Sequence, residues 1–200
     1  MRAQRRKGAK KNPSALHPGG DADFIFRFQN PEGQRLAAGV LRRMPVLAGR
    51  RIRIERAAGL RDRGQALHAG AFLRERRIAF DCTPREFPRI FVHEVFHFVW
   101  ARAGNWRRWS FEGLLESELR AGASGELGWS AEWRKRELTA ENARLRGRRW
   151  REYCCESFCD TAAWLYSGVE RHVEFTLGTE WRRRREAWFR RSLGGGPLPV

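Results

Sequence analysis

Residues 91–100 read FVHEVFHFVW and place two histidines and one glutamate inside a run that is otherwise apolar. If this run is helical, His93 and His97 stand one turn apart, so both imidazoles leave the same face. Glu94 then lies about 100° further round the helix, where it can reach a water held by the two histidines without being a ligand itself. These residue types at this spacing predict a metal site with a general base beside it.

The segment matches the H-E-x-x-H motif, in which two histidines bind zinc and the glutamate acts as the base. With 5 histidines in 200 residues, roughly 0.01 accidental matches are expected in a chain of this composition. The alternative is a pair of core histidines bonded to backbone carbonyls, with Glu94 exposed. The apolar flanks favour the metal site, because such a helix runs through a protein core.

A catalytic zinc ion needs a third protein ligand and an open position for water. No histidine follows His97 at short spacing, and the only later one is the isolated His172. Among the acidic residues, Glu156 and Asp160 lie four residues apart in CCESFCD and share one face of a predicted helix over 149–168. The rival carboxylates are those of Glu152, Glu116 and Glu118.

His93, Glu94 and His97, followed by Glu156-Ser157-Phe158-Cys159-Asp160, resemble the gluzincin pattern of thermolysin-like metallopeptidases, H-E-x-x-H and then E-x-x-x-D. The second segment is also similar to the E-x-x-A-N-x-F-A segment of the small ImmA/IrrE-like peptidases, with Asp for Asn and Ala for the Phe. The resemblance implies a zincin-like α+β fold. In such a fold a small mixed sheet packs on the active-site helix and on a second ligand helix.

The resemblance further implies that Glu156 is the third zinc ligand and that Asp160 orients the first histidine. Glu152 is a weaker candidate, because the position four residues after it is Glu156 itself and not a separate orienting group. The implied activity is that of a zinc-dependent metallopeptidase acting on a protein or peptide, with Zn²⁺ as cofactor and Glu94 as general base. The strand expected over 76–80 resembles the edge strand that holds the substrate in this clan. The candidates for stabilising the oxyanion are His172, Tyr153 and Tyr166.

The length of 200 residues predicts one domain with a sizeable core. Residues 1–20 are basic and polar and predict a disordered arm, and residues 21–193 form the metallopeptidase domain. An Arg/Trp-rich insertion over about 104–148 separates the two ligand helices, and 194–200 form a flexible tail. The sequence has no membrane span and no secretory signal, and three of its four cysteines are bunched, which predicts a cytoplasmic protein.

Local patterns predict the remaining elements. Strands are expected over 23–28 and 51–56, and one bent strand or a short hairpin over 70–81. A helix begins at Pro31 with Asn30 as its N-cap, and the motif helix runs to about Ala103. Ser110 and Thr139 are plausible N-caps within the insertion. A last helix over 179–193 is basic and amphipathic, with its tryptophans and Phe189 facing inward.

The formal net charge of +17 favours contact with nucleic acid or another polyanion. The second function class is therefore a basic nucleic-acid-binding or regulatory protein whose zinc site is structural. Glu94 favours the enzyme, because a structural zinc site needs no base.

Cys154, Cys155 and Cys159 could form a soft metal site. Adjacent thiols on one helix do not easily bind a single tetrahedral ion, and the chain has no C-x-x-C pair. Their interpretation as small buried hydrophobic residues is therefore favoured.

Overall fold

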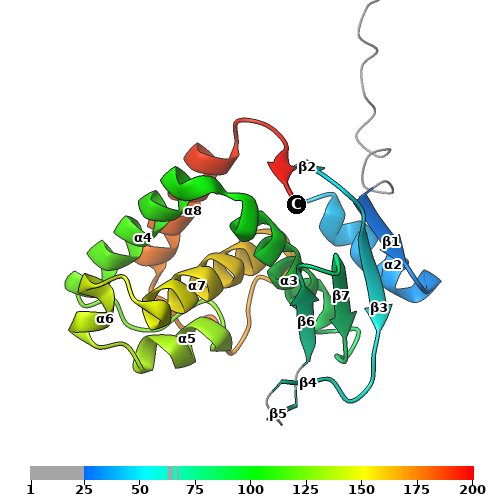
Figure 1. The fold of residues 1–200 in the computed structure, drawn as a ribbon, viewed down its shortest axis with the longest axis horizontal. Helices are drawn as coiled ribbons and strands as arrows, with labels where there is room; N and C mark the ends of the chain where they lie inside the picture. The colour runs from blue at the N-terminus through cyan, green and yellow to red at the C-terminus, as the bar shows by residue number, and fades with distance from the viewer. Residues whose placement is uncertain (1–24, 63–64, 67) are drawn as a thin grey trace, which may run out of the picture.

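A small mixed sheet and seven helices make up the described part of the chain in this computed structural model (Figure 1). The structure describes residues 25–62, 65–66 and 68–200, so the basic arm predicted over 1–20 lies outside the described residues. The mixed α+β composition expected from the sequence is confirmed. No helix in these ranges is both long and apolar enough to cross a membrane.

The main sheet has four strands in the order β1 (Phe26–Phe28), β3 (Ile52–Arg56), β7 (Arg77–Phe80) and β6 (Ala69–Phe72). Strands β1, β3 and β7 are parallel, and β6 pairs antiparallel with β7. In β3 the side chains of Ile52 and Ile54 are buried while that of Arg53 is exposed, so one face of the sheet covers the core and the other meets solvent.

The segment over 70–81 is a hairpin, one of the two forms expected for it. The expectation that residues 76–80 form an edge strand is wrong, because β7 pairs with β3 on one side and with β6 on the other. The edge next to the motif helix is β6. A two-stranded hairpin of β4 (Arg61–Asp62) and β5 (Gln65–Ala66) lies apart from this sheet.

Helices α2 (Pro31–Leu41) and α3 (Phe87–Arg102) pack with the sheet. Asn30 caps α2, and its Oδ1 accepts a hydrogen bond from the Gly33 amide at 2.7 Å, as predicted. Two phenylalanines of α3 contact the strands: Phe91 lies against Phe26 of β1 and Phe87 against Phe80 of β7, with ring centroids 5.3 and 4.8 Å apart. These aromatic contacts hold the motif helix against the strands.

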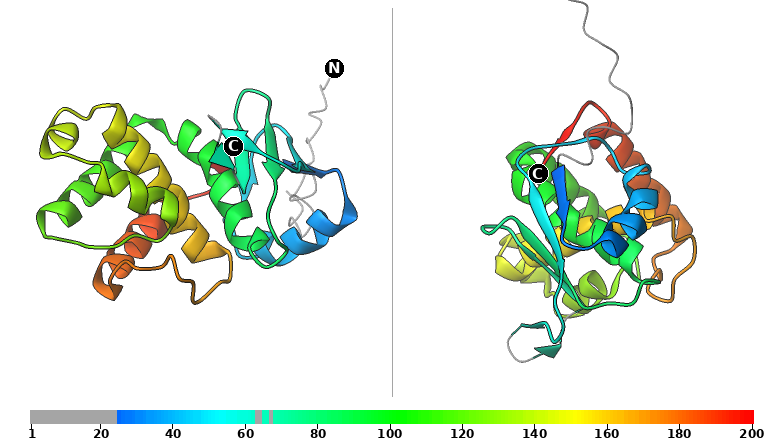
Figure 2. Two further views of the ribbon diagram at one scale, coloured as in Figure 1. Left: turned by 90° about the horizontal axis from the view of Figure 1, so that it is seen from below. Right: turned by 90° about the vertical axis from the view of Figure 1, so that its right-hand side faces the viewer.

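The predicted insertion folds as helices that pack on α7 (Arg148–Tyr166), away from the sheet (Figure 2). These helices are α4 (Gly104–Arg120), α5 (Trp129–Arg136) and α6 (Ala140–Arg144). Thr139 is the N-cap of α6, as predicted. Ser110 is not a cap: it lies inside α4, and its hydroxyl accepts a hydrogen bond from Trp188 Nε1 at 2.9 Å.

The chain over 194–200 differs from the flexible tail that the sequence predicts. Strand β8 (Leu198–Pro199) pairs parallel with β2 (Leu47–Ala48), and Leu198 and Val200 are buried in the main core. Strand β8 contacts α3 as well as β2, and residues 194–196, all glycine, form the turn and bend that lead into it.

A buried arginine links α8 to α4 and to the loop before α5. Arg185 of α8 (Thr179–Leu193) is 0 % exposed, whereas Arg182 and Arg184 are partly buried and Arg183 is exposed. Its guanidinium donates to Glu118 Oε2 at 2.8 Å and to Glu126 Oε2 at 2.6 Å, so two carboxylates neutralise one buried cation. The basic helix is therefore amphipathic as predicted, but one of its arginines belongs to the core.

Replacing Arg185 by methionine leaves Glu118 buried without its counter-charge and leaves Glu126 with Lys135 alone. Arg185→Met is expected to lower the free energy of unfolding by about 3–5 kcal/mol in chemical denaturation. Arg183→Met, on the exposed face of the same helix, is the matched control and should change it by less than about 0.5 kcal/mol. Equal losses in both variants would contradict the role assigned to Arg185.

Candidate metal centre

Helices α3 and α7 lie side by side and carry every residue of the predicted cluster. Helix α7 begins after Gly147 and ends before Gly168, whose φ of 78° is the left-handed conformation that stops a helix. Its face toward α3 carries Glu156 and Asp160, whose carboxylates both contact His93 of α3. This packing brings together donors that are far apart in the sequence.

Three donor atoms converge between the helices. His93 Nε2 lies 3.1 Å from His97 Nε2 and 3.3 Å from Glu156 Oε2, and His97 Nε2 lies 3.9 Å from the same oxygen. Ligands bound at about 2.1 Å to one tetrahedral ion stand about 3.4 Å apart. The three atoms are therefore already spaced as the ligands of a single ion. They form a group that could hold a metal, and the described residues contain one other such group.

Each donor is held by a second contact. Asp160 Oδ1 accepts a hydrogen bond from His93 Nδ1 at 2.7 Å, which leaves the Nε2 lone pair of His93 facing the cluster. The other oxygen of Asp160 accepts from the Ala131 amide of α5 at 3.1 Å. Arg134, also on α5, lies 3.4 Å from Glu156 Oε1 and leaves Oε2 toward the histidines. Sequence reasoning missed both contributions from α5.

The charges around Glu156 keep its carboxylate ionised. Burial raises the pKa of Glu156, but His97, His93 and Arg134 together lower it to about 2. Burial lowers the pKa of His93, but the carboxylates of Asp160 and then Glu156 outweigh this effect and raise the pKa well above its usual range. The ionised carboxylates of this buried cluster therefore favour the binding of positive charge, which can be a proton or a metal cation.

Glu94 is buried, with 8 % of the residue exposed, so the alternative in which it faces solvent does not hold. Burial raises the pKa of its carboxyl group, and that rise is partly offset by His93 and His97 and, to a smaller extent, by a hydrogen bond with the backbone of Ala71 in β6. This contact ties the glutamate of the motif to the edge strand of the sheet. A buried carboxylate with a raised pKa beside a donor cluster is suited to accept and return a proton.

The rival carboxylates have other partners. Glu152 is partly exposed and pairs with Arg148 at 2.7 Å. Glu116 pairs with Arg120, and Glu118 binds the buried Arg185. Of the four acidic candidates, Glu156 is the one whose oxygen faces both histidines.

The three candidates for stabilising an oxyanion lie in different surroundings. The hydroxyl of Tyr153 donates to Glu126 at 2.6 Å inside the Arg185 network. Tyr166 stacks on Phe96, and burial raises its pKa to about 12. His172 lies 3.3 Å from Glu86, about two turns before His93 at the start of α3. These contacts engage the two tyrosines with Glu126 and Phe96, and they place His172 beside the start of α3.

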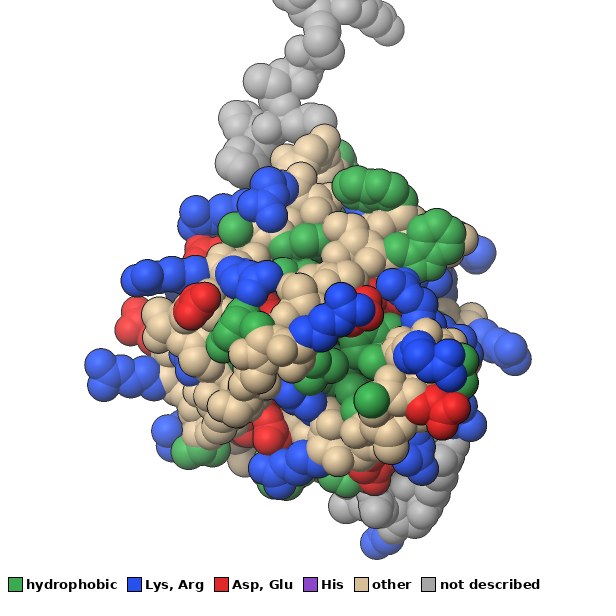
Figure 3. Space-filling view, turned by 90° about the vertical axis from the view of Figure 1, so that its left-hand side faces the viewer, with side chains coloured by type: hydrophobic (Ala, Val, Ile, Leu, Met, Phe, Trp, Pro, Cys, Tyr) green, Lys and Arg blue, Asp and Glu red, His purple; other side chains and the backbone are tan. Residues whose placement is uncertain are grey.

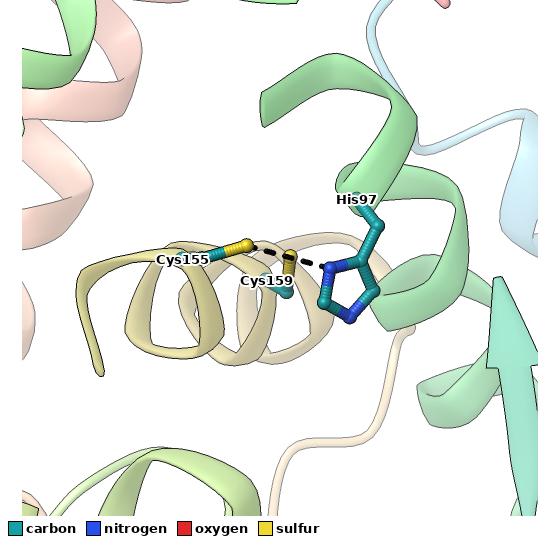
Figure 4. A group of neighbouring side chains, drawn as sticks. All are labelled: His97, Cys155 and Cys159. Atoms are coloured by element: carbon teal, nitrogen blue, oxygen red, sulfur yellow. Dashed lines mark hydrogen bonds between the residues drawn. The ribbon is translucent and has the colours of Figure 1, made fainter. Parts of the chain in front are cut away.

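A second donor group lies against the first. The sulfur atoms of Cys155 and Cys159 point toward the imidazole of His97 (Figure 4), and Cys155 Sγ is 3.5 Å from His97 Nδ1. A hydrogen bond with Cys159 lowers the pKa of Cys155 to about 6, against the effect of its burial. The sequence favoured a purely hydrophobic role for these thiols. It missed that His97, and not Cys154, completes the group.

Comparisons with protein families, with curated proteins and with solved structures find no match to this chain. Its function is therefore argued from the geometry of the site.

The position of Asp160 depends on Gly128, the N-cap of α5. A Cβ atom at this position would overlap the carboxylate of Asp160, which cannot retreat because it bonds His93 and Ala131. Gly128→Ala is therefore expected to lower the free energy of unfolding by about 1–3 kcal/mol in chemical denaturation. Gly113→Ala, in an open position of helix α4, is the control and should be neutral or stabilising by up to ~1 kcal/mol. A Gly128→Ala variant with an unchanged free energy of unfolding would contradict the close contact between Gly128 and Asp160.

Proposed function

We propose that the protein is a zinc-dependent metallopeptidase. The observation that carries this proposal is the convergence of His93 Nε2, His97 Nε2 and Glu156 Oε2 within 3.1–3.9 Å of one another, with Glu94 buried on the same helix. Two imidazoles and one carboxylate are a donor set of catalytic zinc sites, which keep one position open.

The residues present fit a zinc ion. His93, His97 and Glu156 would hold it, and Asp160 and Arg134 would fix the orientation of His93 and Glu156 from behind. When bound, the ion acidifies a water molecule and polarises a carbonyl group. A structural site would have four protein ligands, whereas this group has three.

Glu94 has the role of general base and then of general acid. Its carboxylate takes a proton from the attacking water and later returns the proton to the leaving amine. Burial favours the protonated form that this second step needs, and the backbone of Ala71 holds the side chain in place. A structural or regulatory metal site gives no reason for a buried carboxylate at this position.

The substrate class follows from the strand beside the site. Strand β6 is the edge of the sheet next to α3, and its backbone contacts Glu94 through Ala71. A free strand edge can bind an extended peptide by main-chain hydrogen bonds. A peptide laid along β6 would run past Glu94, so a protein or peptide is the proposed substrate.

Metal content and hydrolysis test the proposal in four proteins. The wild type is expected to purify with, or take up, about one zinc ion per chain and to cut peptides in a mixed library. Glu94→Gln should keep the zinc and lose hydrolysis by about 10²–10⁴-fold, because it retains the shape but not the base. Glu156→Ala should lose zinc, and Glu152→Ala, one turn earlier on α7, is the matched control that should keep it.

The readouts are elemental analysis of dialysed protein and mass spectrometry of the cleaved peptides. A wild type that takes up no zinc, or a Glu94→Gln variant as active as the wild type, refutes the proposal. Loss of zinc by Glu152→Ala with retention by Glu156→Ala would transfer the ligand role to Glu152.

A second candidate property is the binding of a polyanion, in line with the net charge of +17. A hollow on the solvent side of the sheet is lined by six arginines and one acid: Arg27, Arg50, Arg51, Arg53, Arg74, Arg76 and Glu75. Burial, Arg102 and Arg50 lower the pKa of Arg76, which indicates a local excess of positive charge. On the face shown in Figure 3, by contrast, the basic side chains are spread among acidic and hydrophobic ones.

If this hollow binds nucleic acid, the affinity is expected to fall steeply with salt. The double variant Arg27→Gln/Arg74→Gln should bind a labelled single strand more weakly and lower the slope of log affinity against log salt by about 1–2. Arg183→Gln, on the outer face of α8, is the control. Binding that does not depend on salt in fluorescence anisotropy, or an equal loss in the control, would contradict this site.

A further inference from the structure

The thiols of Cys155 and Cys159 form a second donor group on the far side of His97. They occupy successive turns of α7, and both sulfur atoms face the imidazole (Figure 4). The donor atoms of His97, Cys155 and Cys159 all lie within 4.8 Å of one another. The zinc peptidase proposal gives no role to either thiol.

The spacing of these atoms fits an ion. A sulfur and a nitrogen bound to one tetrahedral ion at about 2.3 and 2.1 Å stand about 3.6 Å apart. Cys155 Sγ and His97 Nδ1 are 3.5 Å apart. This distance suits a weak hydrogen bond, and it also equals the separation expected for two ligands of one ion. The two thiols, one turn apart on a helix, complete a three-coordinate set.

The two histidines of the motif differ in what their Nδ1 atoms face. For His93 that partner is the carboxylate of Asp160 at 2.7 Å, the usual kind of group that orients a ligand imidazole. For His97 it is a pair of thiols. Cys154 and Cys159 are both buried in the main core, but only Cys159 joins Cys155 and His97 in a donor group.

We propose that Cys155, Cys159 and His97 Nδ1 form a second metal site, specific for a soft, thiophilic cation such as Cu⁺ or Cd²⁺. Thiolates select such ions over the hard cations that prefer oxygen ligands. Binding displaces the protons of the two thiols and of Nδ1, and these protons pass to solvent.

The consequence for the first site rests on the proposed function, because His97 would then serve both ions through its two nitrogens. The binding free energies of the two sites are coupled, and the coupling is reciprocal. A soft cation at the thiols therefore changes the zinc affinity of the cluster and acts as a regulator of the peptidase.

Titration of the reduced, metal-free full chain with Cd²⁺ tests the site directly. The wild type is expected to develop the ultraviolet charge-transfer band of cadmium–thiolate bonds, saturating at a single ion per chain. Cys155→Ser and Cys159→Ser should each weaken this binding by at least about tenfold. Cys154→Ser is the matched control from the adjacent position and should keep the band, as should Glu156→Ala, which removes a ligand of the first site only.

A measurement on the unaltered chain protects the test against variants that do not fold. Alkylation of the thiols followed by mass spectrometry should show the partly exposed Cys155 protected by Cd²⁺, with the partly exposed Cys82 unprotected. The absence of a thiolate band in the wild type, or a band unchanged by Cys155→Ser and Cys159→Ser, overturns the proposal, as does equal protection of Cys82. A chain that shows the band but no peptide hydrolysis would refute the peptidase alone, and hydrolysis without the band would refute the soft-metal site alone.

Discussion

The carboxylate of Asp160 is the point on which the geometry of this protein depends. It is nearly inaccessible to solvent, and a buried carboxylate is costly unless its oxygens are satisfied. One oxygen bonds His93 of α3 and the other bonds the Ala131 amide of α5, while the residue itself belongs to α7. A single side chain thus joins three helices, and the orientation of His93 follows from it.

The helices between α3 and α7 contribute to the candidate site and are not an appended subdomain. Helix α5 contributes Arg134 behind Glu156 and, through Gly128, the space that Asp160 occupies. The loop before it carries Glu126, which meets Arg185 of α8 in the core. The long segment between His97 and Glu156 therefore supplies the walls of the site, and the arginine network fixes those walls to the last helix.

Much of the site was predictable, because its signals are local. The H-E-x-x-H spacing puts two imidazoles on one face of any helix, and Glu156 and Asp160 follow the same one-turn rule. The cap at Asn30 and the alternation in β3 are equally local, and both match the structure.

The features that were missed depend on contacts between distant segments. Nothing near Arg185 distinguishes it from the arginines around it; its burial comes from Glu118 and Glu126 on another part of the chain. Arg134 and the Ala131 amide reach the site only because α5 packs on α7. Ser110 has the residue type of a cap but lies within a continuous helix, and the last residues become a strand because β2 offers them a partner.

X-ray absorption at the zinc edge, on the full chain loaded with one equivalent of zinc, tests the central claim most directly. The account predicts a first shell of nitrogen and oxygen at about 2.0–2.1 Å, with the outer-shell scattering of two imidazoles and no sulfur. A sulfur shell at about 2.3 Å would place the zinc on Cys155 and Cys159 instead, and a chain that binds no zinc would remove the basis for the peptidase.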